Sequence, residues 1–411
     1  MKIENMLVSD IIPYMNNAKE HPKHQIEQIV NSIREFGFND PIAIDEHNVI
    51  IEGHGRLEAL KLMGINTVDC IRLSHLTEEQ KRAYIIAHNK LTMNTGFNMD
   101  IITEELDFLT THDFDTTLTG FDTDELAEIL HEEKEVVDDD FDITPPEEPK
   151  SKLGDLWILG KHRLLCGDST TDDVQILMND QLADIIFTDP PWNVNYGSDQ
   201  NHPSWKPRTI INDFMSTEAF KDFLFDAFKN MSTYSKSGAM TYVVMSAQEW
   251  ANVMLTLYEN DFHWSSTIIW NKDRLVLSRK DYHTKYEPIW YGWKNGNSRL
   301  HPLADRKQTD VWDFERPSRS DEHPTMKPIP LVARAIENSS KFNNIVLDLF
   351  GGSGTTLIAA EQLNRKCYMM ELDPKYVDVI VNRYFAFTED EHIKLIRDGV
   401  EYSYNDIMDG K

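Results

Sequence analysis

Cysteine is scarce in this chain, because only Cys70, Cys166 and Cys367 occur among 411 residues. Three thiols so far apart form neither a metal-binding spacing nor a disulfide framework, which fits a reducing compartment. No apolar run approaches the roughly 20 residues that cross a bilayer, and the first residues contain no apolar signal segment. We therefore expect a cytoplasmic protein without a membrane partner.

Basic residues are also few compared with acidic ones. The chain has 41 Lys and Arg residues against 69 Asp and Glu residues, for a net charge of −28. Residues 1–134 hold 11 basic and 25 acidic residues, whereas residues 270–334 hold 13 basic and 9 acidic residues. A nucleic-acid partner would therefore contact the second region. The length allows at least two domains, each with its own core.

An apolar run at residues 184–187 is followed by Thr188-Asp189-Pro190-Pro191-Trp192. The run predicts a buried strand and the prolines predict the loop after it, which is where an open α/β sheet places its chemistry. Two prolines remove two backbone donors, so the Asp189 carboxylate and the adjacent carbonyls form a rigid edge of acceptors. Such an edge suits the planar NH₂ group of a nucleobase, on which Trp192 could stack. A plain turn with Trp192 in the core would show the same short motif.

A second motif is a strand at residues 345–348, a glycine turn at residues 350–354 and a helix that follows. No Lys precedes Thr355, which excludes a P-loop, and Leu357 stands where a dinucleotide-binding turn has Gly or Ala. Glu371 ends the next strand, nineteen residues after Gly352. An acidic residue at about that distance accepts hydrogen bonds from ribose hydroxyls. Alone, the pattern predicts a nucleotide-binding α/β unit of any kind.

Nearer the start, residues 49–52 predict a strand, Gly53-His54-Gly55 a tight turn, and residues 56–63 a helix. A helix N-terminus behind a glycine turn suits phosphate, and Arg56 would add a bidentate donor. Arg56 could equally cap the helix or pair with a carboxylate.

The domain limits follow from composition. A capping box at Asp122 and Glu125 predicts the last helix of a first domain at residues 1–134. Residues 135–153 are acidic and proline-rich and predict an extended, solvated linker. We expect the second domain at residues 154–388 and a tail at residues 389–411. Residues 294–322 are rich in Arg, Asp, Ser and Pro, which predicts a surface insertion that recognises the DNA target.

The motifs also resemble those of known families. Asp189–Trp192, the segment His323-Pro324-Thr325-Met326-Lys327-Pro328 and Phe350–Gly354 occur in the order typical of the β class of DNA amino-methyltransferases. The stretch Ile50–Gly64 resembles the ParB-like domain of partition proteins, although His54-Gly55 replaces the middle of the usual Gly-Glu-Arg-Arg turn. The resemblance implies a Rossmann-like α/β methyltransferase with a smaller α+β ParB/sulfiredoxin-like domain, of phage or prophage type or from a restriction-modification system.

The resemblance implies methyl transfer from S-adenosylmethionine to the N6 amine of adenine in double-stranded DNA. In the family that the sequence resembles, enzymes whose motif begins with Asp, as at Asp189, mostly methylate adenine. The N4 amine of cytosine is the alternative, and RNA as substrate is left open. No convincing Pro-Cys nucleophile is present for methylation at cytosine C5. A non-catalytic DNA-binding regulator of the partition type is the alternative of another class. A homodimer is also left open.

The resemblance assigns roles to individual residues. The catalytic residues are Asp189, Pro190, Pro191 and Trp192. The cofactor site consists of Asp168, His323, Thr325, Lys327, Asp348, Phe350, Gly351, Gly352, Gly354, Thr355 and Glu371. A phosphate or nucleotide site in the first domain consists of Gly53, His54, Gly55 and Arg56. No metal is expected.

Overall fold

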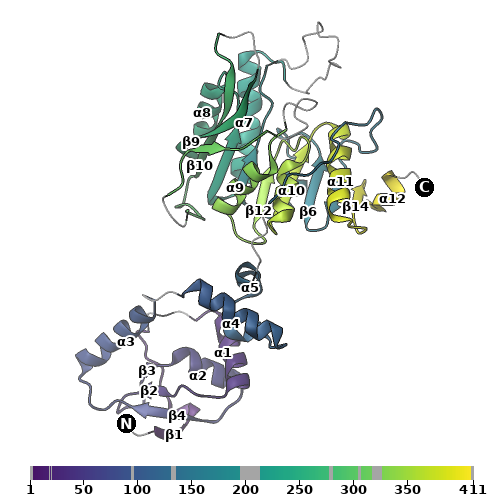
Figure 1. The fold of residues 1–411 in the computed structure, drawn as a ribbon. Coiled ribbons are helices and arrows are strands. Elements are labelled where there is room, and N and C mark those ends of the chain that lie inside the picture. Colours follow the sequence, from purple (N-terminus) through teal and green to yellow (C-terminus); the bar gives the residue numbers. More distant parts are fainter. Residues whose placement is uncertain are drawn as a thin grey trace. The chain divides into compact units, whose positions relative to one another are not determined.

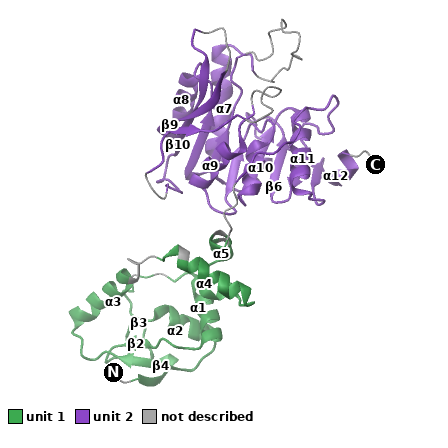
Figure 2. Ribbon diagram, in the orientation of Figure 1, with its two compact units in different colours: residues 1–132 green, residues 133–411 purple. Residues whose placement is uncertain are grey.

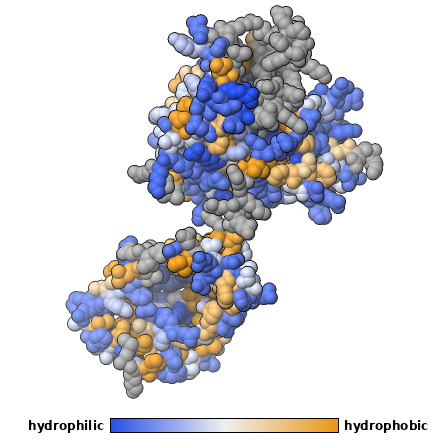
Figure 3. Space-filling model, in the orientation of Figure 1, coloured by the Kyte–Doolittle hydropathy of each residue, from blue (hydrophilic) through white to orange (hydrophobic). Residues whose placement is uncertain are grey.

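The computed structural model describes residues 3–408 except 18, 20, 94–96, 131–135, 195–212, 277–280, 304–306 and 317–325. The chain divides into two compact units, unit 1 at Met1–Glu132 and unit 2 at Glu133–Lys411 (Figures 1 and 2). Each unit buries hydrophobic cores of its own. Hydrophilic residues cover much of the face of each unit that Figure 3 shows, with smaller hydrophobic areas between them.

Unit 1 is an α+β domain on a four-stranded sheet of order β1-β4-β2-β3. Its strands are β1 (Ile3–Leu7), β2 (Ile42–Ile44), β3 (Ile50–Glu52) and β4 (Thr67–Arg72), and its first helices are η1 (Val8–Asp10), α1 (Lys23–Phe36) and α2 (His54–Leu62). Apolar residues of the strands, such as Ile42 and Ile50, share a core with Leu57 and Leu60 of α2. The predicted strand and helix around residue 53 are confirmed, but the predicted turn is shorter than expected, because α2 already begins at His54 and only Gly53 separates it from β3.

Helices end unit 1. They are α3 (Glu78–Met93), α4 (Met99–Thr111), η2 (Thr116–Thr119) and α5 (Thr123–Ile129). The predicted capping box of α5 is present, because the Glu125 N–H donates to Asp122 Oδ1 (2.8 Å) and the Asp122 N–H donates to the Glu125 carboxylate (2.9 Å). Among the described residues, no helix has the length and apolar character needed to cross a membrane.

Unit 2 is built on an eleven-stranded mixed sheet of order β11-β9-β10-β8-β7-β12-β13-β6-β5-β14-β15. Its central strands run parallel to one another and are β8 (Ser235–Val244), β7 (Ala183–Thr188), β12 (Ile345–Asp348), β13 (Lys366–Glu371) and β6 (His162–Cys166). The flanking strands are β9 (Phe262–Val276), β10 (Thr284–Lys294), β11 (Val311–Asp313), β5 (Leu156–Leu159), β14 (Lys394–Arg397) and β15 (Val400–Ser403).

Helices cover both faces of this sheet. One face packs against α9 (Ile329–Ser339), α10 (Thr355–Gln362) and α11 (Pro374–Thr388), and the other against α6 (Val174–Met178), α7 (Thr217–Thr233) and α8 (Trp250–Glu259). Ile185 and Phe187 belong to the first core and Ile186 to the second. A parallel strand covered on both faces is apolar throughout, which explains why this strand could be predicted. The expected Rossmann-like α/β architecture is confirmed, and α12 (Tyr404–Met408) follows β15.

Two segments differ from what composition indicated. Residues 135–153 were expected as a solvated linker, yet Val136 packs against the unit 2 core and Asp139 forms an ion pair with Arg383. Residues 389–411 were expected as a tail, yet β14 and β15 extend the sheet beyond β5. Composition missed both because the partners of these segments lie far away in the sequence.

Candidate active site

The carboxyl ends of the parallel strands meet at one edge of the sheet, and the motifs of unit 2 lie there. Asp189 follows β7, the glycine turn follows β12, and Glu371 ends β13. The Thr188 hydroxyl donates to Asp348 Oδ1 (2.8 Å), which ties the end of β7 to the end of β12. Two motifs 160 residues apart in sequence are therefore neighbours in space.

Asp189 belongs to a chain of alternating charges. Its Oδ2 accepts a hydrogen bond from Lys327 Nζ (2.5 Å). Lys327 Nζ also lies 3.3 Å from Glu287 Oε2, and Lys272 Nζ lies 2.5 Å from Glu287 Oε1. The side chains of Lys327 and Glu287 are each 7% exposed. Two buried cations thus stand opposite two carboxylates, and the chain of charges is neutral as a whole.

This arrangement changes the acidity of its members. Burial raises the pKa of Asp189, an effect that the Lys327 charge opposes and the Glu287 charge reinforces. Burial lowers the pKa of Lys327, but the charges of Asp189 and Glu287 outweigh burial, so that its pKa is raised overall. Lys327 is therefore a fixed positive charge at neutral pH, beside a carboxylate that functions as an acceptor.

Trp192 contacts the same carboxylate. Its indole Nε1–H donates to Asp189 Oδ1 (3.0 Å), and Lys327 Nζ lies 5.1 Å from the centre of a Trp192 ring. Each oxygen of Asp189 therefore has one donor among the residues that the structure describes. A carboxylate oxygen can accept a second hydrogen bond, so the edge can still receive the hydrogens of an amine.

The glycine turn is shaped by close backbone contacts. The Gly351 N–H donates to the Met370 carbonyl (2.8 Å), and a Cβ on Gly351 would lie 2.7 Å from Met369 Sδ. Gly352 has φ +53°, and no atom of the described part of the chain lies within 4 Å of where its Cβ would be. A side chain is excluded at Gly351, and the turn faces open space at Gly352.

The two acidic residues beside the turn differ in their surroundings. Asp348 is 3% exposed, and its oxygens accept hydrogen bonds from the hydroxyls of Thr188 and Thr356 (2.8 and 2.6 Å). Glu371 is half-buried and accepts from the backbone N–H of Gly352 (2.7 Å). Burial raises the pKa of each to about 7, against the effect of these hydrogen bonds. Asp348 therefore braces the turn, whereas Glu371 lies at its open side.

The other predicted cofactor residues have varied surroundings. Asp168 Oδ1 accepts from the Thr170 N–H (2.9 Å), and the preceding Gly167 N–H donates to the Glu371 carbonyl (3.0 Å), which places Asp168 beside the end of β13. The Phe350 ring lies 5.8 Å from that of Phe223 on α7. Thr355 begins α10. His323 and Thr325 lie outside the described residues.

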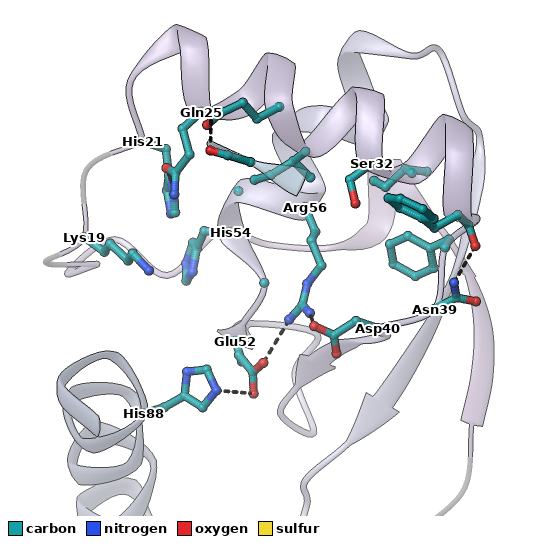
Figure 4. A pocket seen from close by; sticks show the side chains of 18 of the residues that line it. Lys19, His21, Gln25, Ser32, Asn39, Asp40, Glu52, His54, Arg56 and His88 are labelled. Atoms are coloured by element: carbon teal, nitrogen blue, oxygen red, sulfur yellow. Dashed lines mark hydrogen bonds and ion pairs between the residues drawn. The ribbon is translucent and has the colours of Figure 1, made fainter. Parts of the chain in front are cut away.

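Unit 1 contains a second site, a cavity of about 590 Å³ beside the turn at residues 53–56. Gly53 has φ +106° and precedes the first residue of α2. The Arg56 guanidinium forms ion pairs with Asp40 and with Glu52 (2.9 Å). Figure 4 shows Arg56 between these two carboxylates, with His88 reaching Glu52 from α3. The predicted phosphate donor thus already has anionic partners.

The predicted turn residues His54 and Gly55 line the same cavity. His54 Nε2 accepts a hydrogen bond from the Tyr14 N–H (3.1 Å), so this nitrogen carries no proton. Burial lowers the pKa of His54, and the nearby charge of His21 adds to that effect. Gly55 allows α1 to approach, because a Cβ there would lie 3.0 Å from Ile29.

Three family models match successive parts of the chain, and the second of them crosses the boundary between unit 1 and unit 2. Residues 2–89 match the ParB N-terminal domain, residues 100–153 match the ParB-methyltransferase HTH domain, and residues 183–382 match the DNA methylase family of N6 and N4 enzymes. The ParB-like nuclease domain-containing protein YnaK of Escherichia coli K12 is 42% identical over 82 residues, which cover 20% of this chain and 94% of YnaK. The chain joins a ParB N-terminal domain to an N6/N4 DNA methylase domain.

Two further proteins each match about half of the chain. The DNA adenine methyltransferase YhdJ of E. coli K12 is 28% identical over 233 residues, which cover 49% of this chain and 76% of YhdJ. The crystal structure of M1.HpyAVI matches with 19% identity and a TM-score of 0.42, over 54% of this chain and 96% of that chain.

The methylase domain holds polar residues that sequence reasoning missed. Glu287 and Lys272 lie on neighbouring strands, and Glu287 is the one acidic residue of β10. A single carboxylate directly before the apolar run at residues 288–291 is a signal that could have been noticed. Arg383 and Asp139 gave no such signal, because neither residue belongs to a motif that can be recognised in the sequence around it. Lys327 was assigned to the cofactor, yet its ammonium contacts Asp189.

Of the predicted DNA-recognition insertion at residues 294–322, the structure describes residues 294–303 and 307–316. The Arg299 guanidinium lies 5.6 Å from the centre of a Trp293 ring, at the end of β10. Contact between this insertion and DNA stays a prediction.

Proposed function

We propose that this chain transfers a methyl group from S-adenosylmethionine to the N6 amine of adenine in double-stranded DNA. The observation that carries the proposal is the hydrogen bond between Thr188 and Asp348. It joins the acceptor edge at Asp189 to the glycine turn, so an amine held by the first motif would lie next to a ligand held by the second. Reactive groups held together in this way gain rate from positioning alone.

The residues present fit the proposed cofactor. Gly352 leaves open space before the turn, and the half-buried Glu371 offers a carboxylate that accepts hydrogen bonds from the backbone N–H groups of Gly352 and Asp373. Ribose hydroxyls could donate to that carboxylate, with Asp168 nearby. When bound, S-adenosylmethionine supplies an electrophilic methyl group. Asp348 and Thr188 are buried and brace the turn through their hydrogen bond.

The protein residues act on the amine. The NH₂ group of adenine is a poor nucleophile because its lone pair is delocalised into the ring. Inside the duplex it is also stacked and paired, so the base must first be turned out of the helix. Asp189 and the Pro190 carbonyl would accept its two hydrogens and localise the lone pair, and Trp192 would stack on the ring. The nitrogen would then bond to the methyl carbon directly while the bond from that carbon to the sulfonium sulfur breaks, so that S-adenosylhomocysteine leaves and the amine loses one proton to solvent, without a covalent enzyme intermediate.

Two features favour adenine over cytosine. The first residue of the motif is Asp, which mostly accompanies adenine in the family that the sequence resembles. YhdJ, which is 28% identical, is named a DNA adenine methyltransferase. The N4 amine of cytosine presents the same two hydrogens to the Asp189 edge and remains the competing substrate.

Labelled methyl transfer tests the proposal. The full chain is incubated with S-adenosylmethionine that carries a labelled methyl group and with duplex DNA or structured RNA. We expect label in DNA and none in RNA. Label in RNA alone would contradict DNA as substrate. Equilibrium dialysis without any cofactor binding would instead favour the non-catalytic regulator.

We also propose that the unit 1 cavity takes the phosphates of a nucleotide. The left-handed Gly53 exposes the start of α2, and Asp40, with a side chain 73% exposed, can leave Arg56 at little cost. Dialysis of the chain with each of the four ribonucleoside triphosphates would test this, and Arg56→Ala should remove the binding. Equal binding by Arg56→Ala would contradict the site.

A further inference from the structure

Arg383 of α11 is a buried cation at the back of the glycine turn. Its side chain is 1% exposed. Its Nη1 donates to the Ser353 carbonyl (2.9 Å) and lies 3.3 Å from the Thr355 hydroxyl. Ser353 lies within the turn and Thr355 begins α10, so one guanidinium group contacts both parts of the motif.

The other side of the same guanidinium binds Asp139. Arg383 Nε and Nη2 donate to the two Asp139 oxygens at 2.7 and 2.8 Å. A planar guanidinium group that donates to both oxygens of one carboxylate has a fixed orientation. Asp139 therefore determines where the remaining nitrogen of Arg383 points, and that nitrogen is the one that contacts the turn.

Asp139 is part of a short segment at residues 136–139, which we call the strap. Val136 packs against the core, and Val137 exchanges two hydrogen bonds with Gln362 of α10 (3.1 and 3.0 Å). Asp138 accepts from the backbone N–H of Ile329, the first residue of α9 (2.6 Å). With Arg383 of α11, the strap contacts three successive helices. It also begins four residues after the end of unit 1.

We infer that Asp139 is a positioning residue for the methyl-donor site, and that it fixes the glycine turn through Arg383. The inference rests on the proposed function, because the turn is taken to hold S-adenosylmethionine. Without the Asp139 charge, Arg383 loses the partner that orients it, and the Ser353 carbonyl loses a fixed donor. The chain segment that follows the ParB unit thus sets the affinity of the methylase unit for its cofactor.

The test compares full-length Asp139→Asn with Asp140→Asn, a matched change at the next residue, which is exposed. We expect Asp139→Asn to raise the dissociation constant of S-adenosylmethionine and its KM by about tenfold, with kcat at saturating cofactor within about twofold of wild type. Arg383→Lys should raise both constants in the same way, because one ammonium group cannot contact Asp139 and Ser353 together as the guanidinium group does. Asp140→Asn should change neither constant.

A second variant separates positioning from stability. Asp139→Asn with Arg383→Gln leaves no unpaired buried charge, so its thermal midpoint should recover toward that of wild type, while cofactor affinity stays weak. Wild-type affinity in the folded Asp139→Asn protein, or affinity that recovers with stability in the double variant, would overturn the role of Asp139. A wild-type chain that binds no S-adenosylmethionine would instead overturn the proposed function, and the positioning role with it.

Discussion

Arg56 of the ParB unit and Lys327 of the methylase unit each lie between two carboxylates, but at different depths. In the ParB unit, Arg56 contacts Asp40 and Glu52, whose side chains are 73% and 22% exposed. Water screens the Arg56–Asp40 pair and makes it weak, so a ligand phosphate can replace Asp40. In the ParB cavity, Arg56 can therefore exchange Asp40 for the phosphate of a ligand.

In the methylase unit, Lys327 contacts Asp189 and Glu287, and Lys272 closes the chain behind them. Removal of one member would leave a charge unpaired in a place that water scarcely reaches. The methylase edge therefore suits a fixed geometry, in which Asp189 is an acceptor aimed at an amine.

Glu287→Gln should have the largest effect on stability, because it leaves Lys272 and Lys327 facing one carboxylate. We expect a loss of about 3–5 kcal/mol in the free energy of unfolding of unit 2. Asp40→Asn in unit 1 should cost at most about 1 kcal/mol. Urea unfolding of the full-length variants measures both. Equal losses would show that the two clusters do not differ as we describe.

Asp189→Ala should lower kcat by about 10²–10³-fold, by analogy with the loss of one preorganised polar group at a reacting centre. The dissociation constant of S-adenosylmethionine should change little, because the glycine turn and Glu371 hold the cofactor in our account. Single-turnover methyl transfer and equilibrium dialysis provide the two numbers. If cofactor binding disappears as well, the division of labour between the two motifs is wrong.

The sequence indicated those parts of the site that are local. The apolar strand before Asp189, the glycine turn and the strand that ends at Glu371 each carry their signal within a few residues, and the structure contains all three. The pairing of Lys327 with Asp189 spans 138 residues and that of Arg383 with Asp139 spans 244. Such pairs depend on which strands and helices become neighbours, and no local pattern records that.

Glu371→Ala should do the reverse of Asp189→Ala. Loss of a charge-assisted hydrogen bond to ribose should weaken cofactor binding by about 1–3 kcal/mol. The rate at saturating cofactor should remain close to that of wild type. An unchanged dissociation constant would remove Glu371 from the cofactor site.

The pH dependence of cofactor binding should be smaller still. Burial raises the pKa of Glu371 to about 7, and only the carboxylate form accepts hydrogen bonds from both ribose hydroxyls. Affinity should therefore fall as the pH drops through about 7 and level off above it. Titrations from about pH 6 to about pH 8 should show this slope in wild type and a flatter profile in Glu371→Gln. A slope that persists in Glu371→Gln would assign the titration to another group.

The most direct test of the account is the identity of the methylated base. DNA from cells that express the wild-type chain, and from cells that express Asp189→Ala, is digested to nucleosides and measured by mass spectrometry. The account predicts N6-methyladenine above the background of the host with the wild-type chain, and only background with Asp189→Ala. N4-methylcytosine without N6-methyladenine would contradict the assignment to adenine, and equal methylation by Asp189→Ala would contradict the role of the Asp189 edge.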